Sequence, residues 1–392
     1  MYDGFEIDML SLGDADCIVL TQWTQYGPHR VLIDGGKAAD APMVREFLRS
    51  RNITGFWAVV CTHLHNDHAR GLIKLLKDKS ITVSNGWMHN IRNHVSSEAL
   101  KRASSGSSSE ADGMRQVIEN TDELGSAFAS RGLAIQEPFA DSSIAGFPAL
   151  SVLGPSRRFY KQSLQEFAKV TAPRLPPPPS YADALSALSG YAPTGRLSGM
   201  GSIFAPPEPK HETLLSLMRA STSPFAHIGS SSLPFEGALR DSSVKENPKT
   251  QPFNNTSTII GCLFNGSRYL FTADAGADAL GQIPLEWKSL NWMQVPHHAS
   301  AGNLSQKLIE RFCPSFAYIS ACGDSSHPSR AIVSGLVKIG SKVFSTHESG
   351  DLWHIHGSVP ARRGYSPAVP LRGTGEPKPL IGWSPLVPGI IR

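Results

Sequence analysis

Short apolar stretches separated by turn residues run through the first hundred residues of the chain. Residues 5–10 alternate apolar and polar side chains, as a half-buried strand does. Residues 57–62 form an apolar run with the length of a strand that is buried on both faces. The pattern predicts strands at residues 5–10, 17–21, 30–34, 57–62 and 81–84, and helices at residues 41–51 and 69–77.

Regular patterning returns near residue 257. Two apolar runs flank Asn265-Gly266, a dipeptide that favours the tight turn of a hairpin. The pattern predicts strands at residues 257–264 and 268–272, a strand that ends at residues 293–296, strands at residues 316–320 and 342–346, and a helix at residues 329–339.

The middle of the chain has a different composition, rich in Ser, Pro, Gly and Ala, with four consecutive prolines at residues 176–179. We interpret it as a partly ordered insertion whose Pro-rich part is stiff and extended, and which acts as a lid or binds a protein partner. Within it we expect helices at residues 114–130 and 211–220 and a strand at residues 146–154. The predicted organisation is a first half-domain at 1–95, the insertion at 96–248, a second half-domain at 249–357 and an irregular tail at 358–392.

Composition indicates a globular protein without membrane spans. Of 392 residues, 40% are hydrophobic and 18% are charged, and no apolar run is long enough to cross a bilayer. The N-terminus lacks the pattern of a secretory signal. The five scattered cysteines form no CxxC pair, so we expect reduced thiols and a cytoplasmic location. The net charge of +4 permits an anionic substrate.

Chemistry is concentrated directly after the apolar run 57–62, where His63, His65, Asp67 and His68 lie within six residues. Imidazole and carboxylate are ligands that suit zinc, manganese or iron. One short loop after a buried strand can direct His63 and His65 to one metal and Asp67 and His68 to a second. A polar surface loop is the alternative, and it does not account for the HxHxDH spacing.

Two metals need further ligands, including one that bridges them. Asp274 ends the predicted strand 268–272, so its carboxylate can point into a site at the sheet edge; a turn aspartate before Gly276 is the alternative. His297 and His298 directly follow another strand. One of them should complete the second metal, and the other should orient a ligand or touch substrate. The spacing does not decide which.

Six motifs in this order resemble the metallo-β-lactamase superfamily and, within it, the hydrolase domain of ComEC-type competence proteins. They lie at residues 11–16, 32–36, 62–68, 272–274, 295–300 and 325–329. The resemblance implies an α/β fold, a four-layer αββα sandwich with metals at one edge between two halves, and phosphodiester hydrolysis, often of DNA. The chain departs from the pattern at Leu10-Ser11-Leu12-Gly13-Asp14, at Ala299 where glycine is usual, and in having no membrane spans.

Three further residues are candidates for the site. The superfamily normally has one more ligand between the histidine motif and the bridge, and the resemblance favours His89, with His94 as the rival. His327 is expected on a nearby loop, where it binds a phosphate oxygen, protonates a leaving group, or caps the following helix. Asp34 is expected to accept an imidazole N–H, or to be a turn residue before the glycine pair.

We therefore expect a metal-dependent hydrolase. Two divalent ions, Zn²⁺ or alternatively Mn²⁺, share Asp274 and activate a water, while Asp67 binds a metal and orients the nucleophile. The expected substrate is a phosphodiester of DNA, another nucleic acid or a nucleotide. Hydrolysis of a lactone, thioester or β-lactam is the alternative within the fold. A partner-binding protein with a vestigial site is the alternative of another class, and the complete ligand set argues against it.

Overall fold

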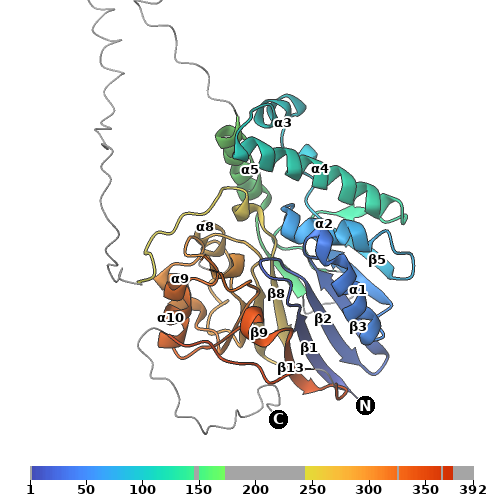
Figure 1. Cartoon of the computed structure of the whole chain (residues 1–392), viewed down its shortest axis with the longest axis vertical. Helices are drawn as coiled ribbons and strands as arrows, with labels where there is room; N and C mark the ends of the chain where they lie inside the picture. The colour runs from blue at the N-terminus through green and yellow to red at the C-terminus, as the bar shows by residue number, and fades with distance from the viewer. Residues whose placement is uncertain (1, 145–149, 173–242, 325, 363–364, 374–392) are drawn as a thin grey trace, which may run out of the picture. The chain divides into compact units, whose positions relative to one another are not determined.

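The computed structural model describes residues 2–144, 150–172, 243–324, 326–362 and 365–373. They belong to one compact unit, formed by Met1–Pro173 and Ser242–Arg392, whereas Arg174–Asp241 form a second unit that lies outside the described residues. The predicted helix at 211–220 therefore lies outside them too. In the first unit two β-sheets lie face to face, with helices on the outer side of each (Figure 1).

The first sheet joins the start of the chain to its last described strand. Its order is β13-β1-β2-β3-β4-β5-β6 among the described residues. The strands from β13 to β3 pair antiparallel, and those from β3 to β6 pair parallel. Their bounds are β1 (Asp3–Met9), β2 (Ile18–Thr24), β3 (Gly27–Ile33), β4 (Gly55–Val60), β5 (Thr82–Trp87), β6 (Ile135–Gln136) and β13 (Leu352–Ser358).

The second sheet has the same mixture of pairings. Its order is β12-β11-β10-β9-β8-β7 among the described residues, antiparallel from β7 to β9 and parallel from β9 to β12. Its bounds are β7 (Leu150–Gly154), β8 (Ile259–Phe264), β9 (Ser267–Phe271), β10 (Trp292–Gln294), β11 (Phe316–Ile319) and β12 (Lys342–Ser345).

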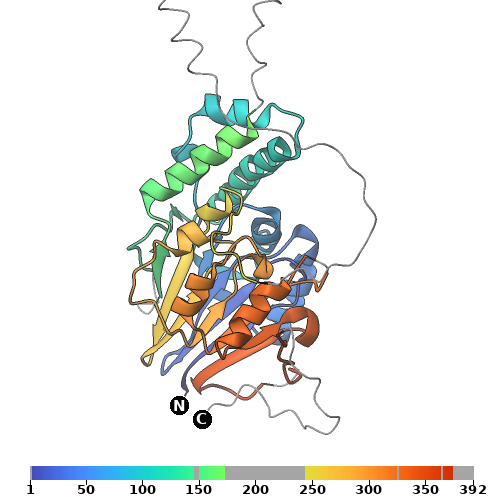
Figure 2. The ribbon, with the colours of Figure 1, turned by 90° about the vertical axis from the view of Figure 1, so that its left-hand side faces the viewer.

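Three apolar clusters hold the layers together. One fills the space between the sheets, and the other two pack the helices onto the outer faces. Helices α3, α4 and α5 also pack against one another (Figure 2). No described helix is long and apolar enough to cross a membrane. The helices are α1 (Ala41–Ser50), α2 (Asn66–Leu75), α3 (Ser97–Ser104), α4 (Ser109–Ala129), α5 (Arg157–Thr171), α8 (Ala277–Leu280), α9 (Gln306–Phe312), α10 (Arg330–Lys338) and α11 (Thr346–Ser349), with 3₁₀ turns η1 (Ala38–Asp40), η2 (Ile91–Asn93), η3 (Asn254–Thr256) and η4 (His297–Ala299).

The predicted four-layer αββα arrangement is confirmed. The strands predicted in both halves are present, with ends shifted by a few residues. Asn265 and Gly266 form the two-residue hairpin turn between β8 and β9, with φ of 46° and 75°. β4 is buried as predicted except at Trp57, which is exposed and stacks on His29. Helices α3, α5, α8, α9 and α11 and strands β6 and β13 were not predicted. The proposed division at residues 95, 248 and 357 stays a prediction.

A buried charge cluster lies on the outer face of β1. Glu6 and Asp8 are fully buried, and the Arg362 guanidinium bonds to both carboxylates. The Tyr365 hydroxyl donates to Asp8. Burial, only partly offset by Arg362, raises the pKa of Asp8 to about 6. The cluster fastens the segment that follows β13 to the first strand of the chain.

Asp8 should make stability depend on pH. Its pKa is higher in the folded protein than the ordinary 3.8, so the folded state binds more protons between about pH 4 and 6. The free energy of unfolding should therefore fall as pH rises through this interval, by up to about 3 kcal/mol. Asp8→Asn should remove this part of the decline in urea unfolding series, whereas Asp3→Asn, on the exposed end of β1, should keep it. Parallel declines in wild type and Asp8→Asn would contradict this assignment.

Candidate metal centre

Loops that follow the parallel strands supply most of the candidate site. Asp34 follows β3 and His63 follows β4, which pair in parallel in the first sheet. Asp274 follows β9 and His297 follows β10, which pair in parallel in the second sheet. Because the carboxyl ends of parallel strands meet at one sheet edge, each sheet collects its polar side chains there. The Thr258 amide, which donates to Thr62 O at 2.9 Å, joins the loops of the two sheets.

A glycine contact sets the position of α2 beside this edge. A Cβ on Gly71 would lie 1.7 Å from Gly35 O, so only glycine allows the helix to approach the loop after β3. The Gly35 amide donates to His68 O at 3.0 Å. As a result, His68, in the first turn of α2, places Nδ1 2.8 Å from Asp34 Oδ2.

One group of ligand atoms surrounds Asp274 Oδ2. His63 Nε2 lies 3.5 Å from this oxygen and 3.1 Å from His65 Nδ1. His297 Nε2 lies 3.7 Å from the same oxygen. His63, His65 and Asp274 therefore place their ligand atoms within 4.8 Å of one another, and His297 adjoins this group through the same carboxylate oxygen.

A second group lies at the other oxygen of the same carboxylate. His68 Nε2 lies 3.4 Å from Asp274 Oδ1 and 3.9 Å from Asp67 Oδ2. His298 Nε2 lies 3.5 Å from Asp67 Oδ2. These four side chains can hold a metal ion together, as can His63, His65 and Asp274. The structure thus separates the adjacent histidines, with His297 in the first group and His298 in the second.

The residues fit a divalent cation. His68 Nε2, His298 Nε2 and Asp274 Oδ1 are buried and have no hydrogen-bond partner among the described residues, and such atoms are costly without one. The 3.4–3.9 Å separations around the second group are too long for hydrogen bonds. Two ligands about 2.1 Å from a tetrahedral zinc ion would lie about 3.4 Å apart. The spacing therefore suits atoms that share an ion.

Hydrogen-bond partners at Nδ1 orient four of the imidazole rings, and His297 has two such partners, Asn303 Oδ1 and Asn254 Nδ2. Four imidazoles turn Nδ1 toward an acceptor and so direct Nε2 into the site, as metal-binding histidines commonly do. These pairs are His68 with Asp34 Oδ2 (2.8 Å), His298 with Ser320 O (2.8 Å), His297 with Asn303 Oδ1 (3.0 Å) and His63 with Thr62 Oγ1 (3.3 Å). Asp34, predicted to accept an imidazole N–H, lies beside His68 Nδ1, and its role stays a prediction.

The backbone between β10 and α9 takes an unfavourable conformation. His297, His298 and Ala299 have successive φ values of 49°, 54° and 64°, in the left-handed region that only glycine adopts freely. This explains why glycine suits the position of Ala299. The turn is held by the His297 amide, which donates to Ala273 O at 3.0 Å. Its consequence is that two consecutive imidazoles serve different ligand groups.

Electrostatics favour a cation in both groups. Burial opposes protonation of His298, but the nearby carboxylates of Asp67, Asp16 and Asp274 raise its pKa to about 9. Burial likewise opposes protonation of His68, and Asp274 foremost raises its pKa well above 6.5. Burial and the neighbouring His63 lower the pKa of His65 to about 3, which keeps that ring neutral. Protons on His68 and His298 thus balance carboxylate charge that a metal ion would balance instead.

The remaining predicted residues lie outside the two groups. His89 is buried with Nε2 3.3 Å from Thr258 Oγ1, and its ring packs on Tyr160, so the structure does not bring it to Asp274. His94 binds Glu137 instead. The His327 ring centroid lies 5.7 Å from those of both His297 and His298, at the edge of the site.

We did not identify from the sequence three polar residues that form hydrogen bonds near the ligands, namely Asp16, Gln294 and Ser320. Asp16 accepts from Gln294 Nε2 at 2.7 Å and from the Ser320 hydroxyl. Gln294 Oε1 also accepts the backbone amide of Thr272, at the end of β9. Two sequence features could have pointed to these residues. Asp16 lies in one motif of the superfamily resemblance, and Gln294 lies shortly before the histidine pair.

Comparisons with known proteins find similar structures but no matching sequence family. No family model and no curated protein matches the chain. A putative metallo-β-lactamase from Thermotoga maritima is 14% identical over 35% of this chain and 54% of its own, about half its length, with a TM-score of 0.24. The metallo-β-lactamase fold protein YhfI from Bacillus subtilis is 7% identical over 90% of this chain and 100% of its own, with a TM-score of 0.41. A diphosphatase from the PhnP family is 11% identical over 88% and 87%, with a TM-score of 0.33.

The fold class is stated from the topology of the chain itself. Two mixed sheets lie between helical layers, and buried histidines and aspartates gather at the carboxyl ends of their parallel strands. This is an α/β fold of four αββα layers with a cluster that could hold metal ions.

Removing the charge of Asp274 should empty both groups, because its two oxygens are shared between them. Asp274→Asn keeps the shape of the side chain, and we expect the metal content per chain to fall from two ions to less than one. Elemental analysis after gel filtration in metal-containing buffer measures this. His94→Gln is the matched control, since His94 is a histidine outside both groups, and it should keep wild-type content. Wild-type metal content in Asp274→Asn would contradict the shared role of Asp274.

Proposed function

We propose that the protein is a metal-dependent hydrolase that cleaves phosphodiester bonds in a nucleic acid or nucleotide. The observation that carries the proposal is the carboxylate of Asp274, whose two oxygens face two separate sets of imidazoles. A single structural ion would need only one such set. Paired ligand groups around a shared carboxylate are the arrangement of two-metal hydrolytic sites.

Bound divalent ions would supply a water of lowered pKa and would polarise a phosphoryl oxygen. His63, His65, His297 and Asp274 would hold one ion. Asp67, His68, His298 and Asp274 would hold the other, with Zn²⁺ favoured by the number of imidazoles and Mn²⁺ as the alternative. Asp67, whose side chain is 25% exposed, is the ligand that can also orient the attacking water.

His327 is suited to act on the substrate rather than on a metal. Its Nδ1 lies 3.0 Å from Asp14 Oδ2, which fixes the ring and leaves Nε2 for another partner. From its place beside His297 and His298, Nε2 would bind a phosphate oxygen or give a proton to the leaving group.

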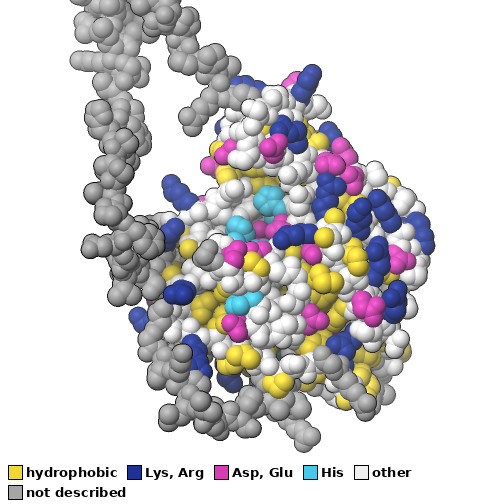
Figure 3. Space-filling view, viewed as in Figure 1, with side chains coloured by type: hydrophobic (Ala, Val, Ile, Leu, Met, Phe, Trp, Pro, Cys, Tyr) yellow, Lys and Arg dark blue, Asp and Glu magenta, His cyan; other side chains and the backbone are white. Residues whose placement is uncertain are grey.

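Positive charge near the site supports an anionic substrate. A cleft of about 410 Å³ beside His65 and His297 is lined on one side by Lys249. Another cleft, of about 570 Å³, lies beside Asp67 and includes Lys37. Histidine and acidic side chains gather near the centre of the face in Figure 3, with Lys and Arg side chains around them. The motif resemblance to ComEC-type domains supports phosphodiesters over lactones, thioesters and β-lactams.

A substrate panel tests this proposal. Metal-loaded protein is incubated with linear DNA, RNA, cyclic nucleotides and a lactone, and we expect hydrolysis of at least one phosphodiester and none of the lactone. His65→Ala removes a ligand of the first group and should lower the rate by more than about 100-fold. His29→Gln, remote from the site, should leave the rate unchanged. Undiminished hydrolysis by metal-depleted protein, or lactone cleavage alone, would refute the proposal.

A further inference from the structure

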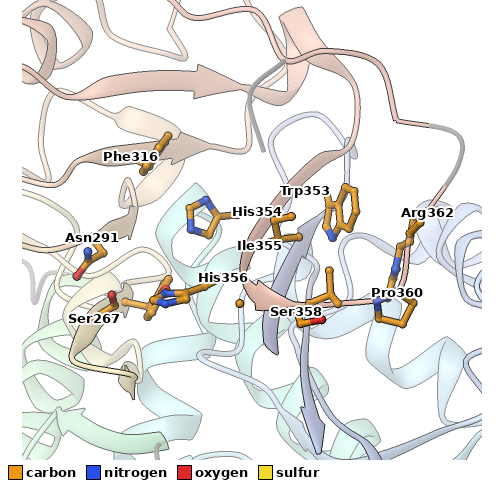
Figure 4. A pocket seen from close by; sticks show the side chains of 14 residues that line it. Ser267, Asn291, Phe316, Trp353, His354, Ile355, His356, Ser358, Pro360 and Arg362 are labelled. Atoms are coloured by element: carbon orange, nitrogen blue, oxygen red, sulfur yellow. The ribbon is translucent and has the colours of Figure 1, made fainter. Parts of the chain in front are cut away.

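A further cavity, lined by arginines, lies on the outer face of the first sheet. It has a volume of about 320 Å³ and is lined by Trp23, Arg30, Ser50, Arg51, Asn52 and residues 360–362. We call it the arginine cavity, because three of its lining residues are arginines and none is acidic. The loop after β13 forms one wall, and Figure 4 shows Pro360 and Arg362 close together in that loop.

Strand register explains why Arg30 lies here. Arg30 on β3 pairs with Thr21 on β2, and Thr21 pairs with Glu6 on β1, so the three side chains share one face of the sheet. The helical layer covers this face through apolar residues farther along the strands, such as Val19 and Leu32. The sheet therefore changes from an apolar to a charged surface at Thr21 and Arg30.

One donor atom of Arg30 has no hydrogen-bond partner in the part of the chain that the structure describes. Its Nε is buried and has no hydrogen-bond partner among the described residues, and its guanidinium lies over the Trp23 ring at 5.8 Å. Burial first, and the neighbouring Arg362 second, lower its pKa. The carboxylates of Glu6 and Asp8 act in the opposite direction and raise this pKa, but among the described residues neither forms an ion pair with Arg30.

The carboxylates nearby are already engaged. Glu6 accepts from Trp23 Nε1 at 2.7 Å and from Arg362, and Asp8 accepts from Arg362 and Tyr365. Glu6 and Asp8 therefore pair with Arg362 rather than with Arg30.

We propose that the arginine cavity binds a small phosphate-bearing anion, such as the pyrophosphate group of a nucleotide, separately from the metal centre. One guanidinium group can bind two phosphate oxygens at once, and the volume of the arginine cavity suits a small ligand. Four strand residues, or about 13 Å, separate Arg30 from Asp34 along β3. The ligand would therefore not touch the metal ligands, and Trp23 would offer an aromatic surface beside it.

Calorimetric titration of inorganic pyrophosphate into the full chain tests the proposal. With EDTA present the metal groups are empty, so binding reports on the arginine cavity, and we expect one site whose affinity falls with added salt. Arg30→Gln should weaken binding by about tenfold or more. Arg51→Gln changes a residue at the end of α1, outside the sheet face, and should also weaken pyrophosphate binding. It is the second test variant if Arg30→Gln does not fold. Thermal unfolding establishes that each variant is folded.

Arg49→Gln is the matched control, because Arg49 lies on the same helix but is exposed and paired with Glu46. It should bind pyrophosphate as the wild type does. Four results would overturn the proposal: no binding in EDTA, unchanged affinity in folded Arg30→Gln or Arg51→Gln, equal loss in Arg49→Gln, or binding of duplex DNA without binding of pyrophosphate. None of these depends on whether the metal centre hydrolyses phosphodiesters.

Discussion

A buried carboxylate between two sets of imidazoles is the constraint on which the rest of the site depends. The Asp274 side chain is 1% exposed, so its charge must be balanced by the groups around it. One of its oxygens faces His63 and His297, and the other faces His68. The glycine contact that brings α2 to the sheet edge and the left-handed turn after β10 both serve this convergence.

Much of this site was predictable because its ligands are local in sequence or directly follow strands. The HxHxDH motif lies on one loop, and Asp274 ends a strand with a clear apolar pattern. The roles of His297 and His298 were not predictable, because they depend on a left-handed turn that a contact with Ala273 stabilises.

Other features depend on contacts that no local pattern reveals. His89 packs on Tyr160, from α5, a helix that the sequence did not predict. Asp16 and Gln294 are hydrogen-bonded although 278 positions separate them. The apolar pattern predicted where most strands lie along the chain, and the motif resemblance implied the four layers. The pairing of β13 with β1 did not, because it joins the two ends of the described chain.

The first sheet has unbalanced negative charge at one edge and unbalanced positive charge on its outer face. At the carboxyl ends of its parallel strands, buried carboxylates exceed the fixed positive charges, and a cation would balance them. On its outer face, Glu6 and Asp8 are bonded to Arg362, and Arg30 has no ion pair among the described residues, so an anion would balance its charge. The same principle, that buried charge requires a partner, therefore points to two ligands of opposite sign.

The most direct test of the central claim is anomalous X-ray diffraction from crystals grown with zinc, recorded above and below the zinc absorption edge. Two anomalous peaks, one at each oxygen of Asp274, with His63, His65 and His297 around one and Asp67, His68 and His298 around the other, are the expected result. A single peak, or zinc bound elsewhere while the Asp274 carboxylate contacts none, would contradict the account.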